Sequence, residues 1–405
     1  MTNQKDPQTK NSRQGLERRF LQLLWASPGT VRTLLWELWR KKAGIALDRR
    51  WRHGKSGPPV NLNLNLTRRC NLKCRMCEQH RHGHGAAAEL SWYDPDRELP
   101  LAAWTDLLDQ VAGFRPRLYL TGGEPTLYRQ FPELVTAAKA RGFLVHLQTN
   151  GTLLAPMGDF LVDRGVEMVT VSLDGPQEVH DHVRGQSGAF RRTAAGLALL
   201  TAARRRQRRP GPILIINCVI SRANLNVLEQ MPALAQELGA DVLQLQHTMF
   251  NSAGNVRRHN QALTPDFARK RGLELVAPSI PEGEYYESEI TAGDLPQLQS
   301  VLSRVRAAAQ GRLKLAFLPG LGPELLDPYY LDLAHPFPQV CEALWKGCRI
   351  LPDGTVSPCL HVVAGNIAHQ PFREIWNGPK MQNFRRLLAR RLFPGCARCC
   401  SRRFV

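Results

Sequence analysis

The sequence predicts an α/β protein whose central part is a partial (βα)6 TIM-like barrel. An N-terminal helical extension precedes this part, and a small cysteine-rich domain follows it. Three observations predict this fold class: β-rich runs alternate with helical stretches in the middle of the chain, a basic amphipathic stretch precedes them, and cysteines gather near the end. The length of 405 residues suits roughly two or three domains.

The first segment, residues 1–58, is expected to form one or two basic amphipathic helices. Within 15–52, apolar side chains recur at helical spacing, and tryptophans stand among many arginines and lysines (Val31, Leu34, Leu35 and Leu38; Trp25, Trp36 and Trp39). Either this apolar stripe packs on the domain behind it, or the helix lies on an anionic membrane surface with tryptophan at the interface. The sequence leaves both interpretations open.

Six runs with strand character lie in the next segment, residues 59–255. The predicted strands are 60–66, 117–120, 144–148, 168–172, 213–220 and 242–246, and the helices between them include 101–112, 131–141, 188–204 and 225–238. Strands that alternate with helices form parallel βα units, which carry their chemistry at the carboxyl ends of the strands. Residues 256–335 are expected to be a helical and loop connection, and 336–405 form the cysteine-rich domain.

Composition limits the classes of function. The 54 Lys and Arg residues against 35 acidic residues give a net charge of +19, which favours phosphate-bearing partners such as anionic lipid or nucleic acid. The polar first twenty residues do not resemble a secretory signal, and no run of eighteen apolar residues follows, so a cytoplasmic protein without membrane spans is expected. The 10 cysteines then lie in a reducing compartment, where close clusters more often bind metal than form disulfides.

The first cysteine cluster, Cys70, Cys74 and Cys77, has the spacing C-x3-C-x2-C directly after the first predicted strand. One short loop can therefore place three thiolates around one metal centre. A 4Fe-4S cube has four irons, so three cysteines leave one iron open for another ligand. The alternative is a zinc site in which Cys74 and Cys77 act with His80 or His82.

Further polar motifs follow the later strands. TGGEPTL comes after the second strand, TNG after the third, and SLDGP, then HDHVRG, after the fourth. Glycine lets the backbone approach a ligand closely, and a glutamate such as Glu124 can accept hydrogen bonds from an amine. Each motif taken singly is also ordinary turn chemistry.

In this order, the motifs resemble the signature of the radical S-adenosylmethionine (SAM) superfamily. The resemblance implies that the open iron binds the amino and carboxylate groups of SAM, and that an electron from a flavodoxin- or ferredoxin-type donor starts cleavage to a 5′-deoxyadenosyl radical. It implies SAM contacts at Met76, Gly122, Gly123, Glu124, Pro125, Asn150, Ser172, Asp174 and Arg184. Met76 stands where the family usually carries an aromatic residue, although a thioether can also pack against adenine. Arg184 either anchors a carboxylate or pairs with Asp181.

The C-terminal run from Cys341 through Gly354 to Cys359 resembles the C-x9-15-G-x4-C opening of SPASM and twitch auxiliary domains. The resemblance implies a second, auxiliary 4Fe-4S cluster with Cys341, Cys359, Cys396 and Cys399 as ligands. Because the chain ends at Val405, the one-cluster twitch form fits better. Cys348 and Cys400 are then spare, with burial the favoured role of Cys348, and Cys218 is expected in the core. Zinc in this four-cysteine site is the alternative.

The resemblance implies an enzyme that cleaves SAM reductively and removes a hydrogen atom from a substrate. Relatives with this layout suggest peptide or natural-product modification, while the class of oxidoreductase or transferase and the further catalytic residues stay open. One alternative is radical modification of a membrane lipid, with the protein peripheral at the inner face of the membrane. The other is a zinc or iron-sulfur protein that binds nucleic acid, which is disfavoured because it gives Gly-Gly-Glu-Pro no role. Leu360, not a carboxylate, follows Cys359, although His361 lies nearby.

Overall fold

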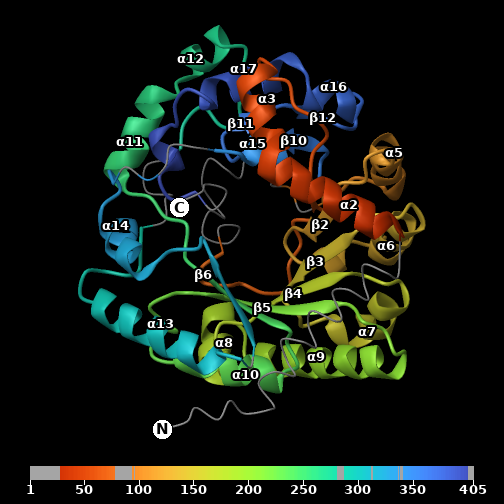
Figure 1. The fold of residues 1–405 in the computed structure, drawn as a ribbon, viewed down its shortest axis with the longest axis vertical. Coiled ribbons are helices and arrows are strands. Elements are labelled where there is room, and N and C mark those ends of the chain that lie inside the picture. The colour runs from red at the N-terminus through yellow and green to blue at the C-terminus, as the bar shows by residue number, and fades with distance from the viewer. Residues whose placement is uncertain are drawn as a thin grey trace.

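The computed structural model describes residues 28–77, 94, 96–280, 287–311, 313–335, 337 and 341–399. Its centre is one curved sheet with helices on the outer face (Figure 1). Six parallel strands follow one another in chain order: β1 (Asn61–Asn65), β2 (Arg117–Thr121), β3 (Val145–Thr149), β4 (Met168–Ser172), β5 (Ile213–Val219) and β6 (Val242–Gln246). The six predicted strands are therefore confirmed.

The sheet extends beyond these six strands at both edges. At one edge, β8 (Lys314–Leu318) pairs in parallel with β6, so a strand from residues 256–335 joins the barrel sheet. At the other edge, β9 (Gly347–Ile350) pairs in parallel with β1, and β10 (Thr355–Ser357) and β12 (Gly365–Asn366) continue antiparallel. In the described ranges the edge strands β12 and β8 do not pair, so the barrel is open. A separate pair joins β7 (Glu274–Leu275) and β11 (Val362–Val363).

The helices cover the outside of the sheet and the cysteine-rich region. They are α5 (Leu101–Val111), α6 (Phe131–Ala140), α7 (Leu154–Asp163), α8 (Gln177–Arg184), α9 (Ala189–Arg206), α10 (Met231–Glu237), α11 (Ala253–Ala262), α12 (Pro265–Lys270), α13 (Leu295–Ala309), α14 (Leu326–Leu331), α15 (Ala343–Lys346), α16 (Phe372–Trp376) and α17 (Pro379–Leu388). The prediction of one helix over 225–238 is wrong at its start, because a 3-10 turn at Leu228–Gln230 precedes α10. Pro232, in the first turn of α10, favours a helix start there.

The strands alternate between an apolar and a polar face. Leu62 and Leu64 of β1 are fully buried in the main core with the helices, so Asn61, Asn63 and Asn65 lie on the opposite, inner face. Hydrogen bonds join polar side chains across that inner face from strand to strand: Tyr119 to Gln148, Gln148 to Ser172 at 3.2 Å, His146 to Thr170 at 2.7 Å, and Gln244 to Asn217 at 2.6 Å. The barrel interior is thus lined with amides and hydroxyls.

The N-terminal extension is helical, as predicted, through α2 (Pro28–Trp39), a π-helical turn (Arg40–Gly44) and α3 (Ile45–Trp51). Trp25 and the rest of 15–27 lie outside the described residues. Glu37 of α2 is 3% exposed and forms an ion pair with Arg117 at 2.9 Å, which ties α2 to the amino end of β2. Within the described ranges, no helix combines the length and apolar character that crossing a membrane requires.

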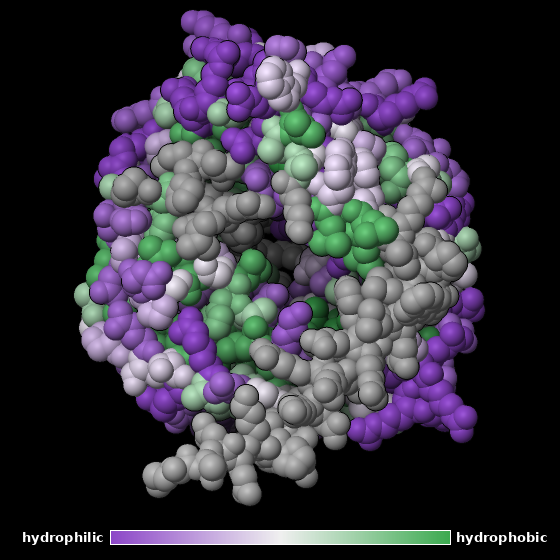
Figure 2. All heavy atoms as spheres, in the orientation of Figure 1, coloured by the Kyte–Doolittle hydropathy of each residue, from purple (hydrophilic) through white to green (hydrophobic). Residues whose placement is uncertain are grey.

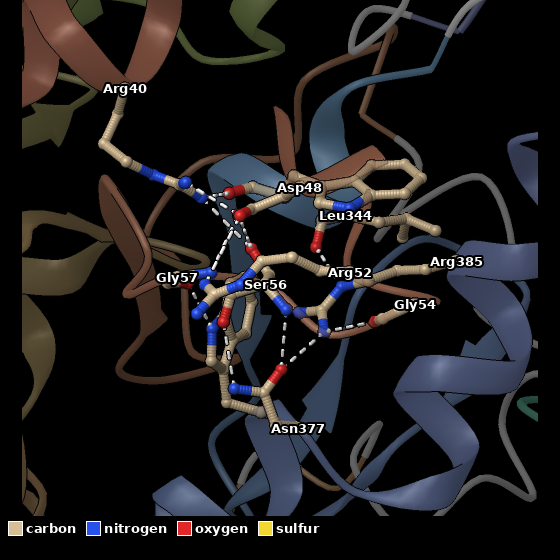
Figure 3. Close-up of polar contacts among 11 residues, drawn as sticks. Arg40, Asp48, Arg52, Gly54, Ser56, Gly57, Leu344, Asn377 and Arg385 are labelled. Carbon is tan, nitrogen blue, oxygen red and sulfur yellow. Dashed lines mark hydrogen bonds and ion pairs between the residues drawn. The ribbon is translucent and has the colours of Figure 1, made fainter. Parts of the chain in front are cut away.

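Buried polar contacts join the extension to the cysteine-rich region (Figure 3). Arg40 donates to the Asp48 carboxylate at 2.7 Å and to the Trp345 carbonyl at 3.3 Å. Asn377 exchanges two hydrogen bonds with the Ser56 backbone at 2.9 and 3.0 Å, and Arg385 donates to the Gly54 carbonyl at 3.2 Å. The extension therefore packs on the rest of the protein, as one of the two interpretations predicts.

Candidate active site and auxiliary cluster site

The three cysteines of the first motif lie together in the loop after β1. Cys74 is 9% exposed and packs with Leu72 and Ala189, and Cys70 and Cys77 pack against the same small cluster. Burial, followed by the charges of Glu124 and the other two cysteines, raises the pKa of Cys70 to about 11. A bound cation would relieve this mutual repulsion and stabilise the thiolates, so the three side chains fit a metal centre.

The glycines after β2 run along the start of this cysteine loop. The Gly123 amide donates to the Thr67 carbonyl and the Glu124 amide donates to the Arg69 carbonyl, both at 2.8 Å. Gly122 has a φ of +138°, and a Cβ on Gly123 would lie 2.3 Å from the Arg69 oxygen. The two loops therefore touch through backbone atoms in a way that only glycine permits.

The Glu124 side chain is fully buried and joins the ends of β2 and β3. One carboxylate oxygen accepts from the hydroxyls of Thr126 and Thr149 at 2.7 and 2.8 Å, and the other accepts from the Asn150 amide at 2.8 Å. Burial raises the pKa of Glu124 although these hydrogen bonds oppose the shift. The second oxygen keeps capacity for another donor, because a carboxylate oxygen accepts more than one hydrogen bond.

Asn150 holds the cysteine loop from the other side. Its amide nitrogen donates to the Asn71 side chain at 2.8 Å, and Asn71 donates in turn to the Thr152 hydroxyl at 2.8 Å. Thr193 of α9 donates to the Asn150 carbonyl at 3.1 Å. Asn71, Thr152 and Thr193 were not identified from the sequence. The one signal that could have identified Asn71 is its place inside the cysteine motif, directly after Cys70.

Asp174 and Arg184 form a buried ion pair next to the cysteine loop. The guanidinium lies 2.7 Å from the Asp174 carboxylate and 3.8 Å from the Cys74 sulfur, and the two side chains are 0% and 8% exposed. The alternative pairing of Arg184 with Asp181 is wrong, because Asp181 accepts from the backbone amides of Gly188 and Phe190 at 2.7 and 2.8 Å. The fold therefore places the Arg184 guanidinium beside the Cys74 sulfur.

The other predicted SAM contacts occupy the same end of the sheet. Ser172, the last residue of β4, accepts from Gln148 on the inner face. Pro125 is buried in the 3-10 turn after Glu124, and Met76 is partly buried between the second and third cysteines. The loops after β1, β2, β3 and β4 thus meet at the carboxyl ends of neighbouring strands, as the fold class predicts.

The second cysteine group comes from three places in the chain: Cys341 before α15, Cys359 after β10, and Cys396 and Cys399 after α17. Cys341, Cys359 and Cys396 pack against one apolar cluster, and Cys399 follows in the turn after Cys396. Burial, with the Cys341 charge adding to it, raises the pKa of Cys359 to about 11, and the His361 amide donates to the Cys359 sulfur at 3.4 Å. These thiols fit a metal centre by the same reasoning as the first group.

The remaining cysteines have different surroundings. Cys348 is 4% exposed in the main core, so its predicted burial is confirmed. This burial raises the pKa of its thiol to about 12. Cys218 is fully buried in the same core, as predicted. Cys400, His80 and His82 lie outside the described residues. Among the described residues, no three Cys, His, Asp or Glu side chains are arranged to ligate one single metal ion. A 4Fe-4S cluster differs from such a site, because each of its cysteine ligands binds a different iron.

Comparison with known families gives two matches. Residues 64–216 match the model of the radical SAM superfamily, and residues 341–400 match an iron-sulfur cluster-binding domain, SPASM. The first match spans the cysteine loop and the motifs after β2, β3 and β4. The second spans the four cysteines predicted to hold the auxiliary cluster.

Curated relatives cover most of the chain. An AdoMet-dependent heme synthase of Methanosarcina barkeri (strain Fusaro / DSM 804) is 30% identical over 81% of this chain and 84% of that protein. A PqqA peptide cyclase of Ruegeria pomeroyi (strain ATCC 700808 / DSM 15171 / DSS-3) is 29% identical over 78% and 74%. The fold is similar to Streptococcus suis SuiB bound to S-adenosylmethionine, with a TM-score of 0.57, 14% identity and coverage of 83% and 69%. The chain therefore belongs to the radical SAM superfamily and carries a SPASM iron-sulfur cluster-binding domain.

Proposed function

We propose that this radical SAM enzyme removes a hydrogen atom from a peptide or a related natural product. The observation that supports this function best is the convergence of the Cys70–Cys74–Cys77 loop, Glu124, Asn150 and the Asp174–Arg184 pair at one end of a polar-lined open barrel. When bound, the reduced 4Fe-4S cluster and SAM together supply the 5′-deoxyadenosyl radical. The protein's task is to hold SAM and place the substrate hydrogen beside it.

In this proposal, different loops bind different chemical groups of SAM. Glu124 would accept from the amino group through its second oxygen, and Arg184, which Asp174 holds in place, would attract the carboxylate. Gly122 and Gly123 would let the backbone approach the methionine part, and Ser172 and Met76 would contact the ribose and adenine. The auxiliary cluster is assigned to Cys341, Cys359, Cys396 and Cys399, four thiols that would ligate one 4Fe-4S cluster.

The polar inner face favours a substrate that forms hydrogen bonds over a lipid chain. Gln148, Asn217 and Gln244 present amides there. Each is already hydrogen-bonded to a neighbouring side chain, and each keeps further donor or acceptor capacity that an acyl chain could not use. A peptide backbone offers donors and acceptors that match amides. The PqqA peptide cyclase supports the same substrate class by similarity. Because the chain is an enzyme, a role restricted to nucleic-acid binding is set aside.

A tetrapyrrole is the second candidate substrate. The heme synthase is 30% identical to this chain over 81% of the chain and 84% of its own length. An iron porphyrin added to the protein would report its binding by a shift of its visible absorption band. A saturable shift would favour this candidate, and an unchanged spectrum would leave the peptide proposal.

The activity is tested on protein reconstituted anaerobically with iron and sulfide. With SAM and dithionite, the wild type is expected to contain about eight irons and to release 5′-deoxyadenosine. Cys74→Ala is expected to keep about four irons, those of the auxiliary cluster, and to release none. Iron analysis and mass spectrometry make the two measurements.

Cys348→Ala serves as the control, because Cys348 is buried in the apolar core and is not assigned to either cluster. It is expected to keep the iron content and the rate. Bound zinc and no SAM cleavage in the wild type would overturn the proposed function.

We also propose that the extension binds an anionic membrane surface. Five of its large apolar side chains are exposed although the helices pack on the protein: Leu35, Leu38, Trp39, Leu47 and Trp51, at 62%, 53%, 48%, 49% and 65%. Exposed basic residues, Lys41, Arg50 and Arg52, lie beside them. Figure 2 has apolar side chains gathered over α2, where Figure 1 places that helix on the surface. An apolar strip beside basic residues is typical of helices that lie in the headgroup region.

The triple variant Leu35→Ser, Leu38→Ser, Trp39→Ser is expected to lose co-sedimentation with vesicles containing phosphatidylglycerol. This variant is sharper than removal of residues 1–52, which would also delete the buried Arg40 and Asp48. Leu199→Ser with Leu331→Ser is the control, because these exposed leucines lie on α9 and α14. Equal sedimentation of the triple variant and the wild type would contradict membrane binding.

A further inference from the structure

The cysteine loop buries the Cys74 thiol and exposes the two cationic side chains on either side of it. Cys74 is buried, whereas Lys73 and Arg75 on either side of it are exposed. The solvent-facing side of the loop is therefore positively charged, and it lies one residue away from a thiol assigned to the SAM-binding cluster.

A second segment lies against this part of the loop. The Arg75 amide donates to the Val183 carbonyl of α8 at 3.0 Å, and a Cβ on Gly185 would lie 2.4 Å from the Lys73 carbonyl oxygen. Ala189, the first residue of α9, packs with Cys74. The end of α8 and the start of α9 therefore share one surface with the cysteine loop.

That second segment adds two more exposed cations, Arg191 and Arg192. Both guanidinium groups fold back toward Gly188, since a Cβ there would meet them at 3.9 and 3.4 Å. When the Gln186 amide is oriented to satisfy its neighbours, it donates to the Asn71 carbonyl at 2.9 Å and accepts from Arg192 at 3.3 Å. Arg192 is thus linked to the cysteine loop through one side chain.

The four cations, Lys73, Arg75, Arg191 and Arg192, define the cluster-loop surface. In the described ranges, none of them forms an ion pair with a carboxylate. The nearby Asp181 is turned toward the backbone amides of Gly188 and Phe190. The positive charge of this surface is therefore left to act on solvent and on partners.

We propose that an acidic one-electron carrier protein of the flavodoxin class docks on the cluster-loop surface. The inference rests on the proposed function, because SAM cleavage needs an electron that this chain does not supply. The carrier is oxidised by one electron, and the cluster held by Cys70, Cys74 and Cys77 is reduced by one; no bond to the carrier forms. Electron-transfer encounters use small, weak interfaces in which complementary charge sets the association rate.

The test compares two reductants on the same reconstituted enzyme. Flavodoxin kept reduced by its reductase must dock, whereas dithionite is a small ion that needs no protein interface. With flavodoxin as reductant, the apparent second-order rate constant is the rate of 5′-deoxyadenosine formation divided by the flavodoxin concentration. The variant Arg191→Glu, Arg192→Glu is expected to lower this constant about tenfold at low ionic strength. Added salt is expected to slow this variant less than the wild type, because in the wild type salt screens the charges that the variant lacks. Dithionite-dependent rates and iron content are expected to stay unchanged.

Arg205→Glu, Arg209→Glu is the matched control, because both arginines are exposed near the opposite end of α9 and the net charge changes equally. It is expected to keep the wild-type flavodoxin dependence. Equal flavodoxin dependence in the Arg191, Arg192 variant and the wild type would overturn the docking surface.

If that variant also lost iron, the variant Lys73→Gln, Arg191→Gln would be measured with the same two reductants and would decide the question. A wild type that released nothing with dithionite would instead contradict the proposed function, and flavin fluorescence of flavodoxin titrated with the variants would still measure docking.

Discussion

Gly123→Ala is expected to abolish assembly of the SAM-binding cluster and, with it, SAM cleavage. A Cβ at this position would lie 2.3 Å from the Arg69 oxygen and 2.8 Å from the Arg68 oxygen. Both are backbone atoms of the cysteine loop just before Cys70, so they cannot turn aside as a side chain would. The loop must move, and the three thiols then lose their common geometry. Iron analysis after reconstitution should give about four irons in place of about eight.

Gly113→Ala is the matched control, because a Cβ on Gly113 meets nothing within 4 Å. This variant should keep the iron content and the rate of 5′-deoxyadenosine formation. Wild-type iron and rate in Gly123→Ala would contradict the inference that this close backbone contact positions the cysteines. A general loss of folding would instead appear as loss of the auxiliary irons too.

The barrel strands could be predicted because their signals are local. Each of the six central strands is a short apolar or alternating run after a helical stretch. β8 was missed because Lys314–Leu318 follows a helix in a segment with no motif, and as an edge strand it is buried less than β5. Its place in the sheet depends on pairing with β6, and such long-range pairing leaves little trace in a five-residue sequence.

The sequence named the candidate side chains of the site, but it did not predict the contacts that join them. The cysteines and the Gly-Gly-Glu motif were found from spacing, whereas the Asn150 to Asn71 bond joins residues 79 positions apart. Arg184 suggested a partner at Asp181, three residues earlier on the same helix. The fold instead brings it to Asp174 after β4, because Asp181 satisfies the backbone at the start of α9. Local spacing therefore offered Asp181 as one of two possible partners, and tertiary contacts decide against it.

Asp48→Ala is expected to destabilise the protein by about 3–5 kcal/mol, the usual cost of removing one partner of a buried ion pair. Asp48 is 4% exposed and binds Arg40, the Ser56 hydroxyl at 3.1 Å and the Gly57 amide at 2.7 Å. Without this carboxylate, Arg40 and nearby Arg385, whose pKa burial lowers to about 9, remain buried without a compensating negative charge. The midpoint of denaturant unfolding, followed anaerobically, measures the loss.

The same carboxylate predicts a pH dependence. Burial alone would raise the pKa of Asp48, but hydrogen bonds from the Gly57 amide and from Arg40 outweigh it and lower the pKa below its usual value. The stabilisation is therefore present above the pKa of an unfolded aspartate, about 4, and is lost as the pH falls through the lower folded value. Asp48→Ala should remove this part of the acid sensitivity.

Asp109→Ala is the control, because its ion pair with Arg141 lies on the surface and is screened by solvent. Equal midpoints for Asp48→Ala and the wild type would mean that the extension can separate from the SPASM domain without cost, and that the contacts in Figure 3 do not hold the two together.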